Sequence, residues 1–255
     1  MKKTNQLIFE EYGKFYDLFY KDKDYSKETN YILDHLIKLD PDVKNVLELG
    51  SGSGNFSEHL TASGLRVSGI ERSESMLSKS IEKSIENFTP YLGDIIDFDL
   101  KIKFDAVVSL FDVISYLTNE EEIISCFKAV NKHLKDGGYF IFDSWHTAGV
   151  YASLPTISIK RVDNDAIDVT RIGEPSIDYE LNTVGVKYEF IVHDKKTHLQ
   201  NKISETHTLR HFSISEINFF AHLSGFRLIK AEEPITGLMP TNTSWKVCYI
   251  LQKHE

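Results

Sequence analysis

The sequence predicts an α/β protein with a doubly wound, seven-stranded, mostly parallel sheet and an antiparallel β insertion after the fifth strand. Three observations lead to this prediction. Between residues 43 and 143, short apolar segments alternate with amphipathic ones, as in a parallel sheet covered by helices on both faces. From residue 157 to 212 apolar residues recur with period two, which is typical of a half-exposed antiparallel sheet. A helix and two strands then follow, so the β block is best explained as an insertion.

Composition limits the possible classes of function. The 255 residues suit one domain with an insertion, and 41% apolar and 12% aromatic residues can form a substantial core. The net charge of −9 argues against nucleic acid or an anionic membrane as partner. Cys126 and Cys248 each lie in an apolar run and are expected to be buried free thiols. Neither an apolar signal core nor a stretch long enough to span a membrane is found, so the expected location is cytoplasmic.

The N-terminal region is expected to form two helices. Between Leu7 and Tyr20, six aromatic residues recur at helical spacings, which fits either a packed core or a lid that faces a ligand. The second helix is expected over Tyr25–Leu39, with Asp24 as its N-cap and Pro41 ending it.

The remaining elements follow from the apolar pattern. The expected strands of the main sheet are Val43–Leu49, Arg66–Ile70, Thr89–Leu92, Phe104–Leu110, Tyr139–Asp143, Phe226–Ala231 and Trp245–Gln252. The expected helices between them are Asn55–Ser63, Ser73–Ile85, Asn119–Leu134 and Ser215–Ser224. Residues 136–138 are expected to form a turn. The link of residues 232–244 is short, so the last strand is expected to insert antiparallel. The period-two runs of the insertion begin at Ile157, Ile167, Val184 and Ile203.

The most informative stretch is the turn after the first strand, where the chain runs Val-Leu-Glu-Leu-Gly-Ser-Gly-Ser-Gly. Gly50, Gly52 and Gly54 let the backbone turn tightly and approach a ligand, and a helix start follows with free N–H groups. A dinucleotide fingerprint would need glycine at Asn55, and the Gly-Lys-Ser/Thr of a phosphate loop is absent. Glu48 disfavours a pyrophosphate here and favours a ligand with a cationic amino group.

An acidic residue followed by alternate glycines after a first strand resembles motif I of the class I S-adenosylmethionine (SAM)-dependent methyltransferases. Glu71 ends the second strand, where a carboxylate can accept hydrogen bonds from both hydroxyls of an adenosine ribose. The resemblance implies that Asp94, at the end of the third strand, meets the adenine amino group and that the N–H of Ile95 meets a ring nitrogen. On local sequence alone, Asp94 could equally be a turn residue. The resemblance covers residues 43–143 and implies a Rossmann-like fold.

The flanking segments resemble a narrower group, the nucleotide-linked amino-sugar N-methyltransferases. The run Phe-Tyr-Asp-Leu-Phe-Tyr ending at Tyr20 resembles their N-terminal segment, and the likeness implies that Tyr16 and Tyr25 contact SAM. The segment Phe104–Leu117 and the position of the β insertion are also similar to this group. The chain departs from it at Asp143, which begins Asp-Ser-Trp-His where those enzymes carry Glu-Pro-Trp-Trp, so the acceptor need not be an amino sugar.

These arguments give a set of expected contacts. The cofactor contacts are Tyr16, Tyr25, Glu48, Gly50, Ser51, Gly52, Gly54, Glu71, Arg72, Met76, Asp94, Ile95, Leu110 and Phe111. The acceptor contacts are Tyr20, Tyr116, Asp143, Trp145, His146, Arg161, Arg171, His207 and His211. His146 is the first candidate for a general base because it follows the carboxyl end of a strand, and Tyr16 is the second catalytic candidate. The alternative for His146 is a loop histidine in contact with solvent, and for each arginine a solvated strand residue.

The expected activity is transfer of a methyl group from SAM to a nitrogen or oxygen of a small soluble acceptor, with S-adenosylhomocysteine as product and no metal. The alternatives are a nucleotide-linked amino-sugar N-methyltransferase and a non-catalytic SAM-binding protein. The acceptor is the only partner expected, with no nucleic acid or membrane, and the chain is expected to be a monomer or a homodimer. The expected domains are a helical lid (1–42), a SAM-binding core (43–150), a β insertion forming part of the acceptor pocket (151–213) and a C-terminal part completing the sheet (214–255).

Overall fold

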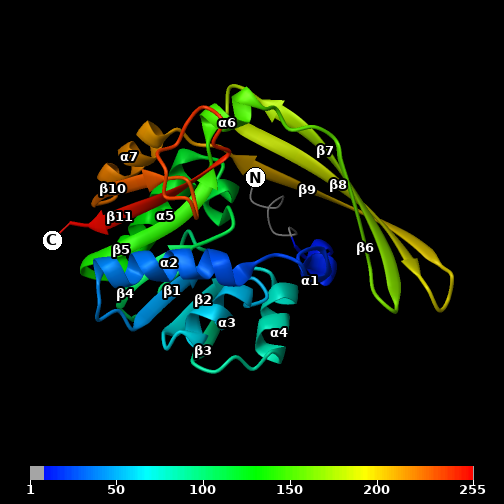
Figure 1. Ribbon diagram of the computed structural model, residues 1–255, viewed down its shortest axis with the longest axis horizontal. Coiled ribbons are helices and arrows are strands. Elements are labelled where there is room, and N and C mark those ends of the chain that lie inside the picture. The colour runs from blue at the N-terminus through cyan, green and yellow to red at the C-terminus, as the bar shows by residue number, and fades with distance from the viewer. Residues whose placement is uncertain (1–8, 255) are drawn as a thin grey trace.

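The computed structural model describes residues 9–254, which form a seven-stranded sheet flanked by helices and a separate four-stranded sheet (Figure 1). The strand order of the larger sheet is β10-β11-β5-β4-β1-β2-β3. β11 runs antiparallel to both of its neighbours, and the other strands run parallel to one another. This confirms the predicted fold class, including the antiparallel last strand. The strands are β1 (Asn45–Leu49), β2 (Arg66–Glu71), β3 (Phe88–Leu92), β4 (Phe104–Ser109), β5 (Leu134–Trp145), β10 (Phe226–Glu232) and β11 (Lys246–Lys253).

Helices cover both faces of this sheet because neighbouring strand residues point to opposite faces. In β1, Val46 packs in the core formed with α2 and α3, whereas Leu47 packs in the core formed with α5 and α7. Helix α4 contacts β2 and β3. The helices are α2 (Tyr25–Leu39), α3 (Asn55–Ala62), α4 (Glu74–Glu82), α5 (Glu120–His133) and α7 (Ile214–Leu223).

The turn expected at residues 136–138 lies instead inside β5, which begins at Leu134. Gly137 has a φ of 73°, and the register between β5 and β4 shifts between Phe104 and Ala106. The glycines therefore form an irregularity that lengthens the strand rather than a turn that precedes it.

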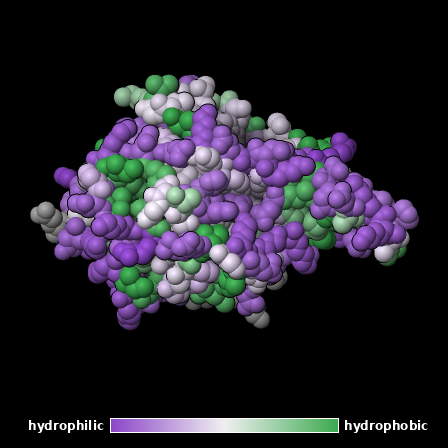
Figure 2. Space-filling model, turned by 60° about the horizontal axis from the view of Figure 1, so that its bottom comes forward, coloured by the Kyte–Doolittle hydropathy of each residue, from purple (hydrophilic) through white to green (hydrophobic). Residues whose placement is uncertain are grey.

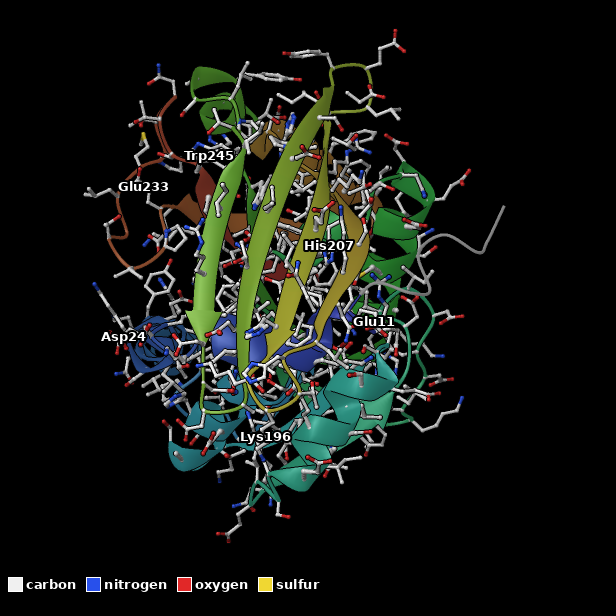
Figure 3. The ribbon with its side chains drawn as sticks, turned by 90° about the vertical axis from the view of Figure 1, so that its right-hand side faces the viewer. Glu11, Asp24, Lys196, His207, Glu233 and Trp245 are labelled. Atoms are coloured by element: carbon white, nitrogen blue, oxygen red, sulfur yellow. The ribbon has the colours of Figure 1, made fainter. Side chains whose placement is uncertain are left out.

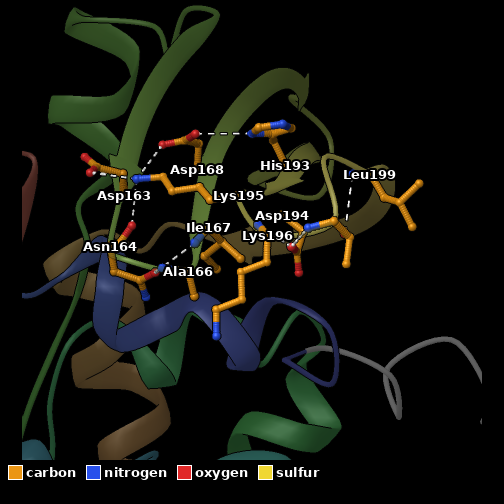
Figure 4. A network of polar contacts seen from close by, with 11 residues as sticks. Asp163, Asn164, Ala166, Ile167, Asp168, His193, Asp194, Lys195, Lys196 and Leu199 are labelled. Atoms are coloured by element: carbon orange, nitrogen blue, oxygen red, sulfur yellow. Dashed lines mark hydrogen bonds and ion pairs between the residues drawn. The ribbon is translucent and has the colours of Figure 1, made fainter.

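The second sheet is an antiparallel meander in the order β6-β7-β8-β9, and it projects from the core as an arm (Figure 1). A short helix that the sequence pattern did not reveal, α6 (Thr147–Ala152), precedes it. At the free end of the arm, Lys195 Nζ lies 3.1 Å from Asp168 Oδ1 and 3.4 Å from Asp163 Oδ2, and His193 also contacts Asp168 (Figure 4). The strands are β6 (Ser158–Asp163), β7 (Ile167–Asp178), β8 (Thr183–Asp194) and β9 (Gln200–Arg210).

The N-terminal segment, defined here as residues 9–24, lies between the core and the arm (Figure 1). The helix expected from Leu7 consists of two short turns, η1 (Tyr12–Phe15) and α1 (Tyr16–Phe19), and Leu7 itself lies outside the described residues. Tyr12 and Phe19 are buried against Phe190 and other apolar residues of the arm. The aromatic run therefore packs mainly against a sheet that is distant in sequence.

The surface seen in Figure 2 is mostly hydrophilic, with hydrophobic residues in separate patches. Within residues 9–254, no helix is both long enough and apolar enough to cross a membrane. Cys126 and Cys248 are both free and buried, as expected.

Candidate active site

An open cavity of about 1270 Å³, including its mouth, lies where β1 to β4 end. The carboxyl ends of these strands form one wall, and the N-terminal segment and the arm form the other. The cavity is open to solvent and extends from the glycine turn and Asp94 at the sheet edge to His207 on the arm, so a ligand in it can contact both the sheet and the arm.

The glycine turn forms the part of the wall after β1. Gly50 and Gly52 line the cavity with φ angles of +67° and +54°, in the left-handed region that L-residues rarely adopt. A Cβ on Gly50 would lie only 2.6 Å from Val113 Cγ2. The backbone at this position can therefore have the observed conformation only with glycine.

Glu71 ends β2 and braces the turn. Its Oε2 accepts a hydrogen bond from the N–H of Gly52 at 2.9 Å, and its Oε1 accepts one from the N–H of Ser73 at 2.8 Å. Burial raises the pKa of Glu71, although these N–H groups and Arg72 oppose the shift. A carboxylate has about four acceptor positions, so Glu71 keeps acceptor capacity for a ligand in the cavity.

Asp94 follows β3 and also lines the cavity. Its Oδ1 accepts a hydrogen bond from the N–H of Ile96 at 3.2 Å, which fixes the start of the loop. Met76 is buried between this side of the cavity and the glycine turn, where its Cε lies 3.3 Å from the position of a Cβ on Gly52. The wall thus offers a carboxylate beside an apolar surface.

A strained turn follows β4. Phe111 and Asp112 have φ angles of 65° and 64° although neither is glycine, and both line the cavity. Asp143 Oδ1 accepts the N–H of Asp112 at 2.7 Å, and Lys246 Nζ lies 3.0 Å from Asp112 Oδ2. Asp112 Oδ1 is buried and has no hydrogen-bond partner among residues 9–254. Burial raises the pKa of Asp112 to about 6, with Lys246 opposing this and Asp143 adding to it.

The N-terminal segment is held against the glycine turn. Asp17 Oδ1 accepts a hydrogen bond from Ser53 Oγ at 2.7 Å and one from Asn55 Nδ2 at 3.1 Å. Lys79 of α4 donates hydrogen bonds to the carbonyls of Gly13 and Lys14. These contacts place four aromatic residues of the segment on the cavity wall, Phe9, Tyr12, Tyr16 and Tyr20, and Tyr25 at the start of α2 lines it as well.

The wall opposite the glycine turn contains a hydrogen-bonded chain of three side chains. Tyr116, in the 3-10 helix η2 (Val113–Tyr116), and His207 of β9 both line the cavity, and Tyr116 Oη lies 2.8 Å from His207 Nδ1. His207 Nε2 lies 3.1 Å from Glu205 Oε1. Figure 3 shows His207 midway along the arm, far from Lys196 at the tip. Burial raises the pKa of Tyr116 well above its usual range.

Residues 46–138 match a sequence family described as "Methyltransferase domain". A dTDP-3-amino-3,4,6-trideoxy-alpha-D-glucopyranose N,N-dimethyltransferase of Streptomyces venezuelae is 29% identical over 220 residues, which cover 86% of this chain and 91% of that protein. The crystal structure of Streptomyces venezuelae DesVI is 27% identical, with a TM-score of 0.77 over 93% of this chain and 97% of the other. A SAM-dependent methyltransferase of Clostridium acetobutylicum has a TM-score of 0.81 at 20% identity and covers 97% and 99% of the two chains.

Residues 46–138 therefore form a methyltransferase domain, and a relative that is similar over most of the chain is also a methyltransferase. In this methyltransferase the cavity wall contains every predicted cofactor contact except Glu48 and Gly54. Glu48 lies behind the turn, with only 2% of its surface exposed, and accepts a hydrogen bond from Ser57 Oγ. Gly54 is the N-cap of α3, and a Cβ there would lie 2.9 Å from Ile85 Cδ1. Both residues therefore shape the turn from behind the wall.

His146 does not line the cavity of the methyltransferase. The prediction that it is the general base was therefore wrong. Its ring Nδ1 lies 3.1 Å from the carbonyl oxygen of Ser244, and the residue is 7% exposed. Trp145, one position earlier, does line the cavity. Because successive residues in extended chain point to opposite sides, Trp145 faces the cavity and His146 the C-terminal loop.

Four other predicted acceptor contacts also lie off the cavity wall. Asp143 is bound behind it to the N–H of Asp112 and to Lys246, and Arg161 is exposed on β6. Arg171 donates a hydrogen bond to Tyr12 Oη at 2.6 Å from behind the aromatic residues. His211 lies past the end of β9, where its Nδ1 is 2.9 Å from Thr147 Oγ1. Of the predicted acceptor contacts, the wall contains Tyr20, Tyr116, Trp145 and His207.

Several residues of the site were missed at the sequence level. Tyr188 and Leu209 line the cavity, and Glu205 holds His207 from the same strand. The period-two pattern contained a usable signal, because Glu205 and Leu209 lie two positions on either side of His207 and so share its face. Within residues 9–254, no group of three or more His, Cys, Asp or Glu side chains is placed to hold a metal ion.

Proposed function

We propose that this methyltransferase transfers the methyl group of SAM to a nitrogen or oxygen nucleophile of a small molecule bound beside it. One observation carries the proposal. A single cavity has the glycine turn, Glu71 and Asp94 on one wall and the aromatic and histidine side chains of the N-terminal segment and the arm on the other. The first wall suits the adenosine and methionine parts of SAM, and the second suits an acceptor.

The charges of the first wall fit this donor. SAM carries a sulfonium and an ammonium group against a single carboxylate, and the wall presents Glu71 and Asp94 against Arg72, while Asp112 is paired with Lys246. We assign Glu71 to the ribose hydroxyls, Asp94 and Ile95 to the adenine, and the turn from Gly50 to Gly52 to the methionine part. Tyr16 of the N-terminal segment and Tyr25 at the start of α2 would cover the ligand.

The sulfonium of SAM is an activated methyl donor, so the protein has to supply orientation, exclusion of water and a destination for the acceptor's proton. An in-line displacement needs the nucleophile about 3–3.5 Å from the methyl carbon, and holding it there accounts for much of the rate. Phe111 lies where the two walls meet, with Tyr20 edge-on at 5.1 Å and Lys23 Nζ over the ring at 3.4 Å. These contacts hold the Phe111 ring in place between the expected positions of the two ligands.

A narrower function, N-methylation of a nucleotide-linked amino sugar, is supported by one comparison. The relative from Streptomyces venezuelae is named for such a substrate, and the similarity extends over 91% of its length and so beyond the methyltransferase domain.

The test has two steps. SAM should raise the melting temperature of the purified protein, because binding to the native state alone stabilises it by about 2.7 kcal/mol at a hundred times the Kd. Stabilisation by NAD and not by SAM would contradict the proposal.

In the second step, methyl-labelled SAM is incubated with the protein and either dTDP-3-amino-3,4,6-trideoxy-α-D-glucopyranose or its 3-hydroxy analogue. Label on the amine supports the narrower function, and label only on the hydroxyl supports O-methylation. SAM binding without label transfer to these probes or to a metabolite extract would favour a non-catalytic role.

A further inference from the structure

We propose that Tyr116, His207 and Glu205 form a proton relay that takes the proton from the acceptor nucleophile during methyl transfer. The inference rests on the proposed function and adds residues that the family's cofactor motif does not include. The cavity-lining phenol of Tyr116 would be the catalytic group, His207 the proton acceptor behind it, and Glu205 a positioning residue.

The hydrogen bonds fix the direction of the relay. The N–H groups of Phe9 and Tyr12 donate to the Glu205 carboxylate, the second at 3.0 Å. Burial opposes ionisation of Glu205, but the hydrogen bonds from His207 and these N–H groups keep its pKa below the usual range. An ionised carboxylate only accepts hydrogen bonds, so the Nε2 of His207, 3.1 Å away, carries the proton.

The tautomer of His207 then decides the role of Tyr116. With the proton on Nε2, the Nδ1 of a neutral imidazole is an acceptor, and the phenol 2.8 Å away donates to it. The oxygen of Tyr116 keeps its lone pairs, which can accept the N–H or O–H of a ligand in the cavity. Each atom in the chain therefore has an acceptor for the proton it would pass on.

The surroundings of His207 hold this arrangement in place. The rings of Phe9 and Tyr188 lie edge-on to the imidazole at centroid distances of 5.0 and 5.2 Å. His207 is 1% exposed, so bulk water does not compete for its nitrogens. The guanidinium of Arg72 lies 6.0 Å from the Tyr116 ring centroid.

The step balances without another reactant. The nucleophile's lone pair forms the bond to the methyl carbon, and the carbon–sulfur bond breaks with its electron pair remaining on sulfur as a thioether. The proton of the nucleophile passes to Tyr116 Oη while the phenol's own proton passes to His207 Nδ1. The resulting imidazolium lies beside the Glu205 carboxylate and loses its proton to water when the products leave. The acceptor class implied is an amine or hydroxyl that must lose a proton.

The first test needs no acceptor. Nitrogen-15 NMR of the histidine side chains is recorded at about pH 8 on the full chain, with the His207 signals assigned by their loss in His207→Gln. The expected result is a neutral ring with the proton on Nε2. Tyr116→Phe should shift the Nδ1 signal towards that of a nitrogen without a hydrogen bond, and Glu205→Gln should weaken the preference for this tautomer. A proton on Nδ1, or a ring that stays doubly protonated, would overturn the relay even if SAM binds.

The second test is kinetic and uses whichever of the two dTDP-sugar probes accepts label. Tyr116→Phe and His207→Gln should each lower kcat about 10²-fold, with KM for SAM changed less than about twofold. The double variant should be no worse than about threefold below the single ones, because the residues act as a unit. Multiplied losses or an unchanged kcat would overturn the relay. Tyr179→Phe and His193→Gln, which alter exposed residues of the arm, serve as matched controls.

Discussion

The two walls of the cavity are built in different ways. The wall at the sheet edge comes from consecutive strand ends, and its shape depends on the backbone, as at Gly50. The opposite wall joins segments far apart in sequence: the N–H of Phe9 donates to a carboxylate 196 residues later. The first wall is therefore set by local sequence and sheet topology, whereas the second depends on long-range side-chain packing.

Among the substitutions that test this difference between the walls, Gly50→Ala is expected to have the largest effect. The substitution places a Cβ 2.6 Å from Val113 and forces alanine to φ +67°, which costs roughly 1–3 kcal/mol in strain alone. We expect the rise in melting temperature caused by SAM to be abolished. The matched control is Gly64→Ala, where φ is +90° but no atom lies within 4 Å, so stability should fall while the SAM effect remains. Equal SAM binding by Gly50→Ala and wild type would refute a backbone-determined wall.

Glu48→Gln tests what lies behind the same wall. Burial raises the pKa of Glu48 to about 8, although Ser57 opposes the shift, so the native state holds a proton that the unfolded chain releases near pH 4–5. Because the native state then binds more protons, the free energy of unfolding should fall between about pH 5 and 8, by up to a few kcal/mol. Urea unfolding of wild type and Glu48→Gln at pH 6 and pH 9 measures this. The variant should lose less stability than the wild type on going to pH 9, and parallel losses would rule out a protonated Glu48.

Asp17→Asn tests whether the second wall contributes to SAM binding, and its expected effect on the Kd is smaller. The substitution removes the charge that accepts hydrogen bonds from Ser53 and Asn55 across the cavity rim. We expect the Kd for SAM to rise about two- to tenfold by calorimetry, with a stability change within about 1 kcal/mol because the side chain is partly exposed. Asp22→Asn changes an exposed residue of the same segment and should leave the Kd unaltered. An unchanged Kd in Asp17→Asn would mean that the N-terminal segment does not contribute to binding the donor.

The free end of the arm should matter least. His193→Gln removes a contact with Asp168 in which both side chains are largely exposed, so the free energy of unfolding should change by less than about 0.5 kcal/mol. Urea unfolding checks this value. A change above about 1 kcal/mol would show that the tip is coupled to the rest of the arm.

The sequence was sufficient for the first wall and not for the second. Strand ends, a glycine turn and acids at fixed positions follow from local patterns, so Gly50, Glu71 and Asp94 could be placed before the structure was known. Period-two patterning also predicted the arm. Neither pattern predicts how the arm is oriented on the core, and this orientation determines where β9 meets η2.

His146 and His207 show why the sequence did not predict which side chains of the second wall face the cavity. Both lie on or next to predicted strands, and their local sequences do not distinguish them. The structure turns His146 to Ser244 and His207 to Tyr116 because the facing of a strand residue depends on which element packs against it. The role of Glu205 was invisible for the same reason, since its partners Phe9 and Tyr12 are contributed by the far end of the chain.

Glu205 connects two parts of the site that are far apart in sequence. One carboxylate accepts both the N–H groups of the N-terminal segment and the imidazole of His207. The position of the N-terminal segment and the orientation of the His207 ring therefore depend on the same side chain, so a change in either one removes a hydrogen bond that helps to hold the other.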